Sequence, residues 1–196
     1  MTTFSPEELE FHKKEKIGVK TDLPIKVEIP KDSVLKRLVP PHSKKSRLVT
    51  IEDIDRVIED SKVLYELCFT SNGFYKGAFA MHHSQIDDKD PLSFFVTAEK
   101  NIVINPSILR HSSYLKDSRE ACMTFGDKPM VMVQRWQKIV VEYYSVVLDD
   151  EKRFDNDSDK DYFKLSNKIE EDLSGFQSLV WQHEIDHGNA LYIYQY

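Results

Sequence analysis

Two histidines separated by three residues, near the C-terminal end of the chain, constrain its fold more than any other sequence feature. The segment His183-Glu184-Ile185-Asp186-His187 has the pattern H-E-x-x-H. Side chains four positions apart face the same way on an α-helix, so both imidazoles can bind one metal ion there. Glu184 then lies beside the ion, where its carboxylate can take a proton from an attacking water. The pattern predicts a helix with a metal site, and an exposed helix that merely carries two histidines and two acids is the alternative.

Apolar periodicity predicts two helices. The first covers residues 50–68, where apolar side chains recur every three or four positions and Thr50 is a suitable N-cap. It should end near Ser71-Asn72-Gly73, because an Asn-Gly pair readily adopts positive φ. The second runs from residue 175 to about residue 190 and contains the histidine motif, with apolar residues on one side.

Four segments between these helices have the composition of β-strands. They are rich in β-branched and aromatic residues and are separated by proline, glycine or clusters of charge. The four segments are residues 92–97, 101–104, 131–133 and 139–147. We expect them to form a mainly antiparallel sheet, followed by an acidic loop at residues 149–161.

Size and charge limit the possible classes of protein. A chain of 196 residues with 40% hydrophobic content can bury one sizeable core, so a single domain is expected. Its 27 basic and 33 acidic residues are mixed along the chain, and a net charge of -6 does not favour direct nucleic-acid binding. The sequence has no run of about 18 apolar residues that would predict a membrane span. Residues 1–20 contain four glutamates and no apolar run, unlike a signal or transit peptide, so we expect a cytoplasmic protein.

A third metal ligand has to come from outside the motif, because a catalytic zinc or iron site uses three protein ligands and one open position. Cys122 is the candidate, since it lies in a polar segment before a proline-containing loop. Cys68 lies on the first predicted helix, and a core position is expected for it. Cysteines so far apart indicate free thiols or metal ligation rather than a disulfide framework. Thiolate and imidazole together suit zinc or iron and disfavour calcium or magnesium.

Three segments carry a resemblance to the peptide deformylase family, in that family's order. Residues 182–187, Q-H-E-I-D-H, match the family's Q-H-E-x-D-H completely, and residues 120–124, E-A-C-M-T, resemble E-G-C-L-S with three replacements. Residues 78–85, A-F-A-M-H-H-S-Q, can be laid without gaps on G-x-G-x-A-A-x-Q, where only Gln85 is strictly kept. With weaker matches between them, the resemblance covers residues 29–196 as one catalytic domain. Residues 1–28 are then a polar N-terminal extension.

The resemblance implies an α+β fold, in which mainly antiparallel β-sheets surround a central helix bearing both histidines. It implies one divalent ion held by Cys122, His183 and His187, with Fe2+ as the native metal and Zn2+ or Ni2+ able to replace it. The implied reaction removes the formyl group from the N-terminal formyl-methionine of nascent chains at the ribosome and releases formate. Glu184 would move the protons, while the Gln85 side chain and the Met123 backbone N–H would stabilise the oxyanion. A monomer is expected.

The resemblance also implies a supporting set of residues around the ligands. Glu120 and Arg135 resemble a family ion pair that braces the cysteine loop, for which an ordinary surface bridge is the alternative. Gln182 and Asp186 are candidates for orienting the ligands, although surface positions on the helix are equally compatible with the sequence.

Two alternatives to this interpretation remain open. Where the family has two glycines and two alanines, this chain has larger residues at four positions, Ala78, Ala80, His82 and His83. We expect His82 and His83 to pack in the interior or line the pocket, and a descendant that only binds is conceivable. A zincin-type protease is the other alternative. Only nine residues follow His187 and none is His, Asp, Glu or Cys, which argues against that protease.

Overall fold

The computed structural model describes residues 38–69, 78–99, 101–125, 128–148 and 163–195. The α-helices are α2 (Ile54–Phe69) and α4 (Gly175–Gly188), and the short 3-10 helices are η1 (Ile51–Asp53), η2 (His83–Gln85), η3 (Met123–Phe125) and η4 (Ile193–Gln195). The strands are β1 (Ala80–His82), β2 (Phe94–Thr97), β3 (Ile102–His111), β4 (Leu115–Glu120), β5 (Val131–Trp136), β6 (Lys138–Tyr144), β7 (Val146–Leu148), β8 (Phe163–Leu165) and β9 (Ile169–Ser174).

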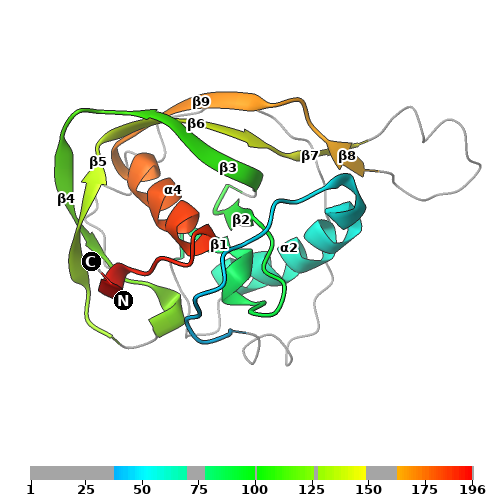
Figure 1. Cartoon of the computed structure of the whole chain (residues 1–196), viewed down its shortest axis with the longest axis horizontal. Coiled ribbons are helices and arrows are strands. Elements are labelled where there is room, and N and C mark those ends of the chain that lie inside the picture. The colour runs from blue at the N-terminus through cyan, green and yellow to red at the C-terminus, as the bar shows by residue number, and fades with distance from the viewer. Residues whose placement is uncertain (1–37, 70–77, 100, 126–127, 149–162, 196) are drawn as a thin grey trace, which may run out of the picture.

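Five strands form one antiparallel sheet in the order β1-β2-β3-β6-β9. Two further antiparallel pairs, β4–β5 and β7–β8, form separate two-stranded ribbons. In Figure 1, α4 crosses the middle of the molecule, with β4–β5 on one side, β6 and β9 above it, and α2 on the other side. The expected α+β fold, with antiparallel sheets around a central helix, is confirmed.

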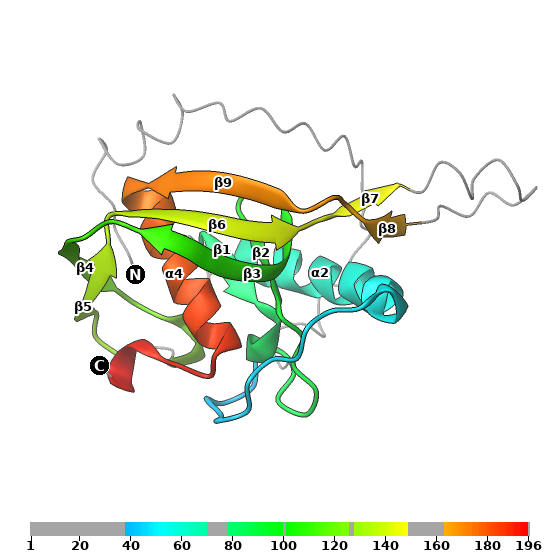
Figure 2. The same cartoon turned by 45° about the horizontal axis from the view of Figure 1, so that its top comes forward.

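Strand β2 shows why the core lies on both sides of the sheet. Alternate side chains of a strand point to opposite faces. Phe94 packs in the cluster that contains α2, whereas Phe95 packs in the cluster that contains Trp181 of α4. A strand buried on both faces needs a continuous apolar run, which residues 94–96 supply. Figure 2 shows the resulting layers, in which β3, β6 and β9 lie side by side over α4.

The first predicted helix is confirmed, with a tighter first turn. Residues 51–53 form η1, and the α-helix proper begins at Ile54. Thr50 is the N-cap residue of this turn, as expected, and its backbone N–H and hydroxyl both donate to the Asp53 carboxylate, at 2.9 and 3.0 Å. Arg47 adds two hydrogen bonds to the same carboxylate. The predicted stop at residues 71–73 and the acidic loop at residues 149–161 lie outside the described residues.

The predicted strands need correction in length and number. The segment 139–147 is broken at Ser145 into β6 and β7, which pair with different strands. Strand β3 continues to residue 111, past Asn105, whose φ of 52° marks a bulge in the β3–β6 register. The Asn105 amide bonds both backbone groups of Val49, at 2.8 and 2.9 Å, and thereby ties the bulge to the start of η1.

Strands β1, β4, β8 and β9 were not predicted: β1 and β8 have only three residues each, whereas β4 and β9 are largely polar and do not alternate cleanly. The sequences of β4 and β9 are L-K-D-S-R-E and I-E-E-D-L-S.

None of the helices in the described ranges combines the length and the apolar character that crossing a bilayer requires.

Candidate metal site

Three potential metal ligands converge between the β4–β5 ribbon and α4. Cys122 lies two residues beyond the end of β4, whereas His183 and His187 lie one turn apart on α4. The Cys122 Sγ atom is 3.2 Å from Nε2 of His187, and one ligand atom from each of the three residues lies within 4.8 Å of the others. A thiolate and two imidazoles fit zinc or ferrous iron, and three protein ligands leave a position for a reacting group.

Helix α4 is fixed in register against the end of β5 by Gln182. Its Oε1 accepts a hydrogen bond from the Trp136 N–H at 3.0 Å, and its Nε2 donates to the Trp136 carbonyl at 2.8 Å. The Ser178 hydroxyl donates to the same carbonyl at 2.9 Å. Gln182 is therefore buried and positions the helix that carries the ligands, rather than bonding to a ligand itself. The helix begins at Gly175, whose φ of +56° favours glycine.

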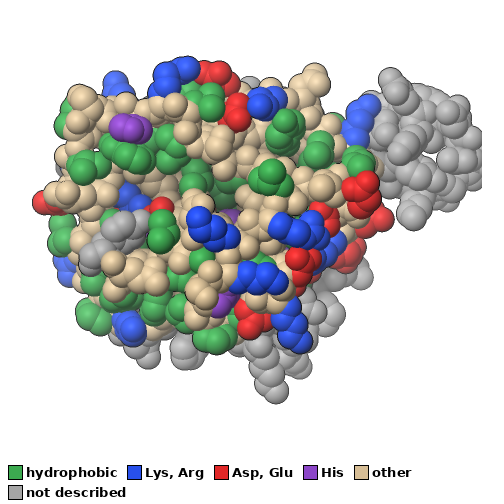
Figure 3. Space-filling model, viewed as in Figure 1, with side chains coloured by type: hydrophobic (Ala, Val, Ile, Leu, Met, Phe, Trp, Pro, Cys, Tyr) green, Lys and Arg blue, Asp and Glu red, His purple; other side chains and the backbone are tan. Residues whose placement is uncertain are grey.

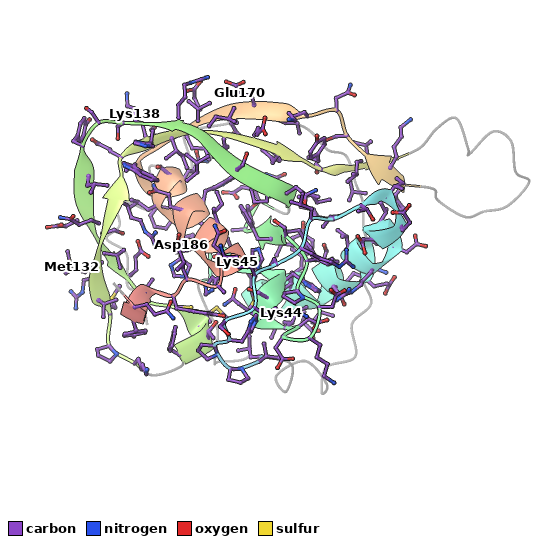
Figure 4. All side chains as sticks on the ribbon, in the orientation of Figure 1. Lys44, Lys45, Met132, Lys138, Glu170 and Asp186 are labelled. Carbon is purple, nitrogen blue, oxygen red and sulfur yellow. The ribbon has the colours of Figure 1, made fainter. Side chains whose placement is uncertain are left out.

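A buried ion pair links the two ribbon strands to the first histidine. Glu120 accepts two hydrogen bonds from Arg135, at 2.8 and 2.9 Å, and a third from Nδ1 of His183 at 2.9 Å. Arg135 also donates to the carboxylate of Asp186, which is labelled on α4 in Figure 4. Because Nδ1 of His183 is bonded to Glu120, its Nε2 is left to face the site.

These contacts set the charge states around His183. Burial raises the pKa of Glu120, but the hydrogen bonds from Arg135 and His183 outweigh this effect and lower it to about 2. Without a metal ion, burial lowers the pKa of His183, while hydrogen bonds to Cys122 and Glu120 outweigh it and raise that pKa to about 10, so a bound ion would replace the proton on Nε2. Glu120 is therefore ionised and holds the His183 ring by a charge-assisted hydrogen bond.

Glu184 lies between the two histidines in sequence and is 4% exposed. Its Oε2 atom has no hydrogen-bond partner among the described residues. Burial raises the pKa of Glu184 to about 7, so the carboxyl group can both accept and donate a proton near neutral pH. Cys68, in contrast, is a buried part of the core around α2, and burial raises the pKa of its thiol.

Gln85 ends η2 with its side-chain amide directed at the cysteine loop. Its Oε1 accepts from the His82 N–H at 2.8 Å, and its Nε2 donates to the Thr124 hydroxyl at 3.0 Å. Met123 directly follows Cys122 and begins η3. The structure thus brings Gln85 and the Met123 segment together beside the candidate ligands.

His82 and His83 are both fully buried. Nδ1 of His82 accepts the Ser84 N–H at 3.0 Å, and burial lowers the pKa of His82 to about 3. Nδ1 of His83 accepts the Leu92 N–H at 2.9 Å, which leaves Nε2 to donate to Asp60 at 3.0 Å. Both side chains therefore have structural contacts where smaller family residues were expected.

Sequence reasoning missed three residues around the site. Thr124 accepts a hydrogen bond from the Gln85 amide, Tyr192 packs against the His187 ring, and the His42 N–H donates to the Tyr192 hydroxyl. Only the aromatic character of the last ten residues could have suggested Tyr192, and His42 had no signal in the sequence.

Comparison with known proteins gives this geometry a family. A model of the polypeptide deformylase family matches residues 32–156. Peptide deformylase from Streptococcus mutans is 34% identical over 97 residues, which is 48% of this chain and 38% of that protein. Peptide deformylase from Thermotoga neapolitana is 30% identical over 91 residues, 46% of this chain and 44% of that protein. Each match therefore spans less than half of the relative's length.

The fold has solved counterparts. The crystal structure of peptide deformylase from Thermotoga maritima aligns with a TM-score of 0.59 at 23% identity, and covers 78% of this chain and 88% of that one. At this identity the likeness supports the fold alone. Because the family model extends over more than half of the sequence, the chain belongs to the polypeptide deformylase family.

Proposed function

We propose that the chain is a metal-dependent hydrolase that removes the formyl group from an N-terminal formyl-methionine and releases formate. The observation that carries the proposal is the convergence of Cys122, His183 and His187 with Glu184 beside them. The family match supports it and does not favour an unrelated zincin-type protease or a pure binding module.

Cys122, His183 and His187 would hold one divalent ion, with Fe2+ as the native metal and Zn2+ or Ni2+ as possible replacements. The donor set fits this assignment, because one soft thiolate and two imidazoles meet within 4.8 Å. When bound, the ion would act as a Lewis acid toward the formyl carbonyl and would increase the acidity of a water at the open position.

Glu184 would take the proton from the attacking water and pass it to the departing amine. Its burial supports this role, because the raised pKa of the carboxyl group, about 7, matches the task of moving a proton both ways. The Gln85 amide and the Met123 N–H would donate hydrogen bonds to the oxygen that gains charge in the transition state. Glu120 and Arg135 would hold His183 and the cysteine loop in place.

The substrates would be formylated nascent chains in the cytoplasm, met by a monomer that binds no nucleic acid directly. The charge distribution supports the absence of direct nucleic-acid binding. On the face shown in Figure 3, Lys and Arg side chains are interleaved with Asp and Glu rather than forming one continuous basic surface.

The test is formate release from formyl-Met-Ala-Ser by protein reconstituted anaerobically with Fe2+, Ni2+ or Zn2+. Glu184→Gln keeps the shape of the side chain but removes the base, so it should retain the metal and lose most activity. Glu170→Gln on β9 is the matched control, because Glu170 is exposed and pairs only with Arg110 among the described residues. A folded, metal-loaded wild type that releases no formate with any of the three ions would refute the proposal.

A further inference from the structure

The chain turns back after α4 and covers the candidate ligands with its last described residues. Tyr192 and Ile193 are only 3% and 4% exposed. Ile193 packs against Cys122 and Val133 in a small cluster of their own. Figure 1 shows this segment, in dark red, beside the lower end of the β4–β5 ribbon. The segment is therefore part of the wall around the site.

His187 and His183 are held in different ways. A histidine that binds a metal through one nitrogen usually donates its other N–H to a carboxylate, carbonyl or water, which fixes the orientation of the ring. His183 follows this rule through Glu120. For His187, Nε2 faces Cys122, but Nδ1 is buried and has no hydrogen-bond partner among the described residues. Its orientation must come from contacts with neighbouring side chains.

Tyr192 supplies such a contact. Its ring lies 5.2 Å from the His187 ring, at an interplanar angle of 71°, which is a favourable edge-to-face arrangement. The His183 ring lies at 4.9 Å and 76°, so the two neighbours confine the His187 ring together. His183 is itself fixed by Glu120, and Tyr192 is the neighbour that comes from outside the motif.

Tyr192 is in turn fixed by contacts with two other parts of the chain and with its own C-terminal segment. Its hydroxyl accepts a hydrogen bond from the His42 N–H at 3.2 Å, across 150 residues of sequence. Phe125 of η3 packs edge-to-face on its ring at 5.7 Å and 86°. Its backbone N–H donates to the Gln195 side chain at 2.8 Å. The Tyr192 side chain is thus held through its hydroxyl and by Phe125, and its backbone is held by Gln195, so the ring can confine the His187 ring.

We propose that Tyr192 is a positioning residue for the metal site: its ring orients His187 in place of a hydrogen bond, which Nδ1 makes with none of the described residues. The inference rests on the proposed metal site and concerns the geometry of binding, not the chemistry of the formyl group. It predicts that an aromatic ring at position 192 is needed for metal affinity, whereas loss of the hydroxyl alone has a smaller effect, because Phe125 still holds the ring.

The experiment measures Co2+ affinity and the visible absorption spectrum of the Co2+ protein, both of which report on ligand geometry without any substrate. Tyr192→Leu and Tyr192→Met remove the ring, and should weaken Co2+ binding by about tenfold and alter the spectrum. Tyr192→Phe keeps the ring and should retain the wild-type spectrum, with an affinity within about twofold. Two ring-free variants are used so that poor folding of one does not end the test.

Tyr143→Leu is the matched control for loss of stability. Tyr143 is 9% exposed, packs edge-on against Trp181 at 5.0 Å and donates its hydroxyl to Glu171. This variant should lose stability yet keep the Co2+ affinity and the spectrum of the wild type.

The inference is overturned if a folded ring-free variant at position 192 binds Co2+ like the wild type, or if Tyr143→Leu weakens binding equally. Failure of both ring-free variants to fold would also overturn it, because stability alone would then explain Tyr192. A wild type that binds no Co2+ would overturn the proposed metal site itself.

Discussion

The Oε2 atom of Glu120 lies 2.9 Å from Nδ1 of His183, which joins the end of β4 directly to the first histidine of α4. Arg135 holds the same carboxylate from the neighbouring strand with two hydrogen bonds. Glu120 and Arg135 are 9% and 4% exposed, so water competes weakly for these groups. The cysteine that follows β4 and the histidine on α4 are thus held by one ion pair.

Replacing Glu120 with glutamine should weaken metal binding. The amide cannot offer the charge-assisted hydrogen bond that fixes His183, and such supporting contacts typically change metal affinity 10- to 100-fold. Competition with a chromophoric zinc chelator measures the change. Glu171→Gln is the control, because Glu171 bonds to Tyr143 in a different part of the core. Equal zinc affinity in all three proteins would show that Glu120 does not act through His183.

The candidate ligands could be proposed from the sequence because their spacing is chemically restrictive. Histidines four apart need a helix, and Cys122 stands apart from Cys68 because only Cys68 lies on an apolar helical face. Their supports were harder to predict. Gln182 was equally compatible with a surface position, since its partner is the backbone of Trp136, and backbone partners leave no signature in the sequence.

The fold was predictable where burial imposes a pattern. Residues 94–96 must be apolar throughout because β2 is covered on both faces, and they were recognised as a strand. Strand β9 lies at the edge of the sheet, and Leu173 is its only buried residue. Its acidic residues gave the segment no strand-like apolar pattern, so it was not predicted. The role of Tyr192 depends on the path of the chain after α4, which local periodicity cannot reveal.

Gln85→Leu should retain the metal and lose catalytic rate. Loss of one donor to the oxyanion typically lowers kcat by about 100- to 1,000-fold, and leucine removes the amide while keeping most of the volume. Formate release beside metal analysis measures both quantities, with the exposed Gln134→Leu on β5 as control. If Gln85→Leu is fully active while His82→Ala is inactive, then His82 has the role assigned to Gln85.

The identity of the bound metal should determine how fast the protein loses activity in air. If Fe2+ is the native ion, exposure to oxygen should inactivate the iron form as the metal or Cys122 oxidises, and Ni2+ should slow that loss. Activity is followed over time in air for both forms, with anaerobic samples as controls. Equal half-lives for the iron and nickel forms would argue against iron as the native metal.

Gly188→Ala should destabilise the protein because of His82. A Cβ atom at position 188 would lie 3.0 Å from Nε2 of His82, which is fully buried and has little room to move. At a helical position without this neighbour, alanine would be favoured over glycine by about 1 kcal/mol. The contact with His82 should reverse that preference and lower the free energy of unfolding by about 1–3 kcal/mol.

The substitution should be better tolerated in a His82→Ala background. Urea denaturation of the wild type, the two single variants and the double variant measures the coupling between the two positions. If the effects of the two substitutions on the free energy of unfolding are additive, the destabilisation by Gly188→Ala does not come from His82.

His82 should also make the stability of the metal-free protein depend on pH. Burial lowers the pKa of His82 to about 3, with smaller contributions from His83 and His42, against an ordinary value of 6.5. The folded state therefore binds this proton less readily than the unfolded state. Stability from the neutral ring is fully present above about pH 6.5 and is lost as the pH falls toward about 3, by up to about 1.4 kcal/mol per pH unit.

A variant that cannot take up this proton isolates the effect. His82→Asn keeps an acceptor for the Ser84 N–H but does not titrate. It should be less stable than the wild type at pH 7, because the smaller side chain leaves space in the core. Its free energy of unfolding should then fall less steeply below pH 6.5, so that the two curves converge. Burial also lowers the pKa of His187, so both proteins should keep a residual slope, and the loss of His82 changes the His187 contribution only through the smaller charge interaction between the two rings. Urea denaturation at pH 7, 6, 5 and 4 in the presence of a chelator measures both curves. Parallel curves would mean that His82 is not held neutral in the folded protein.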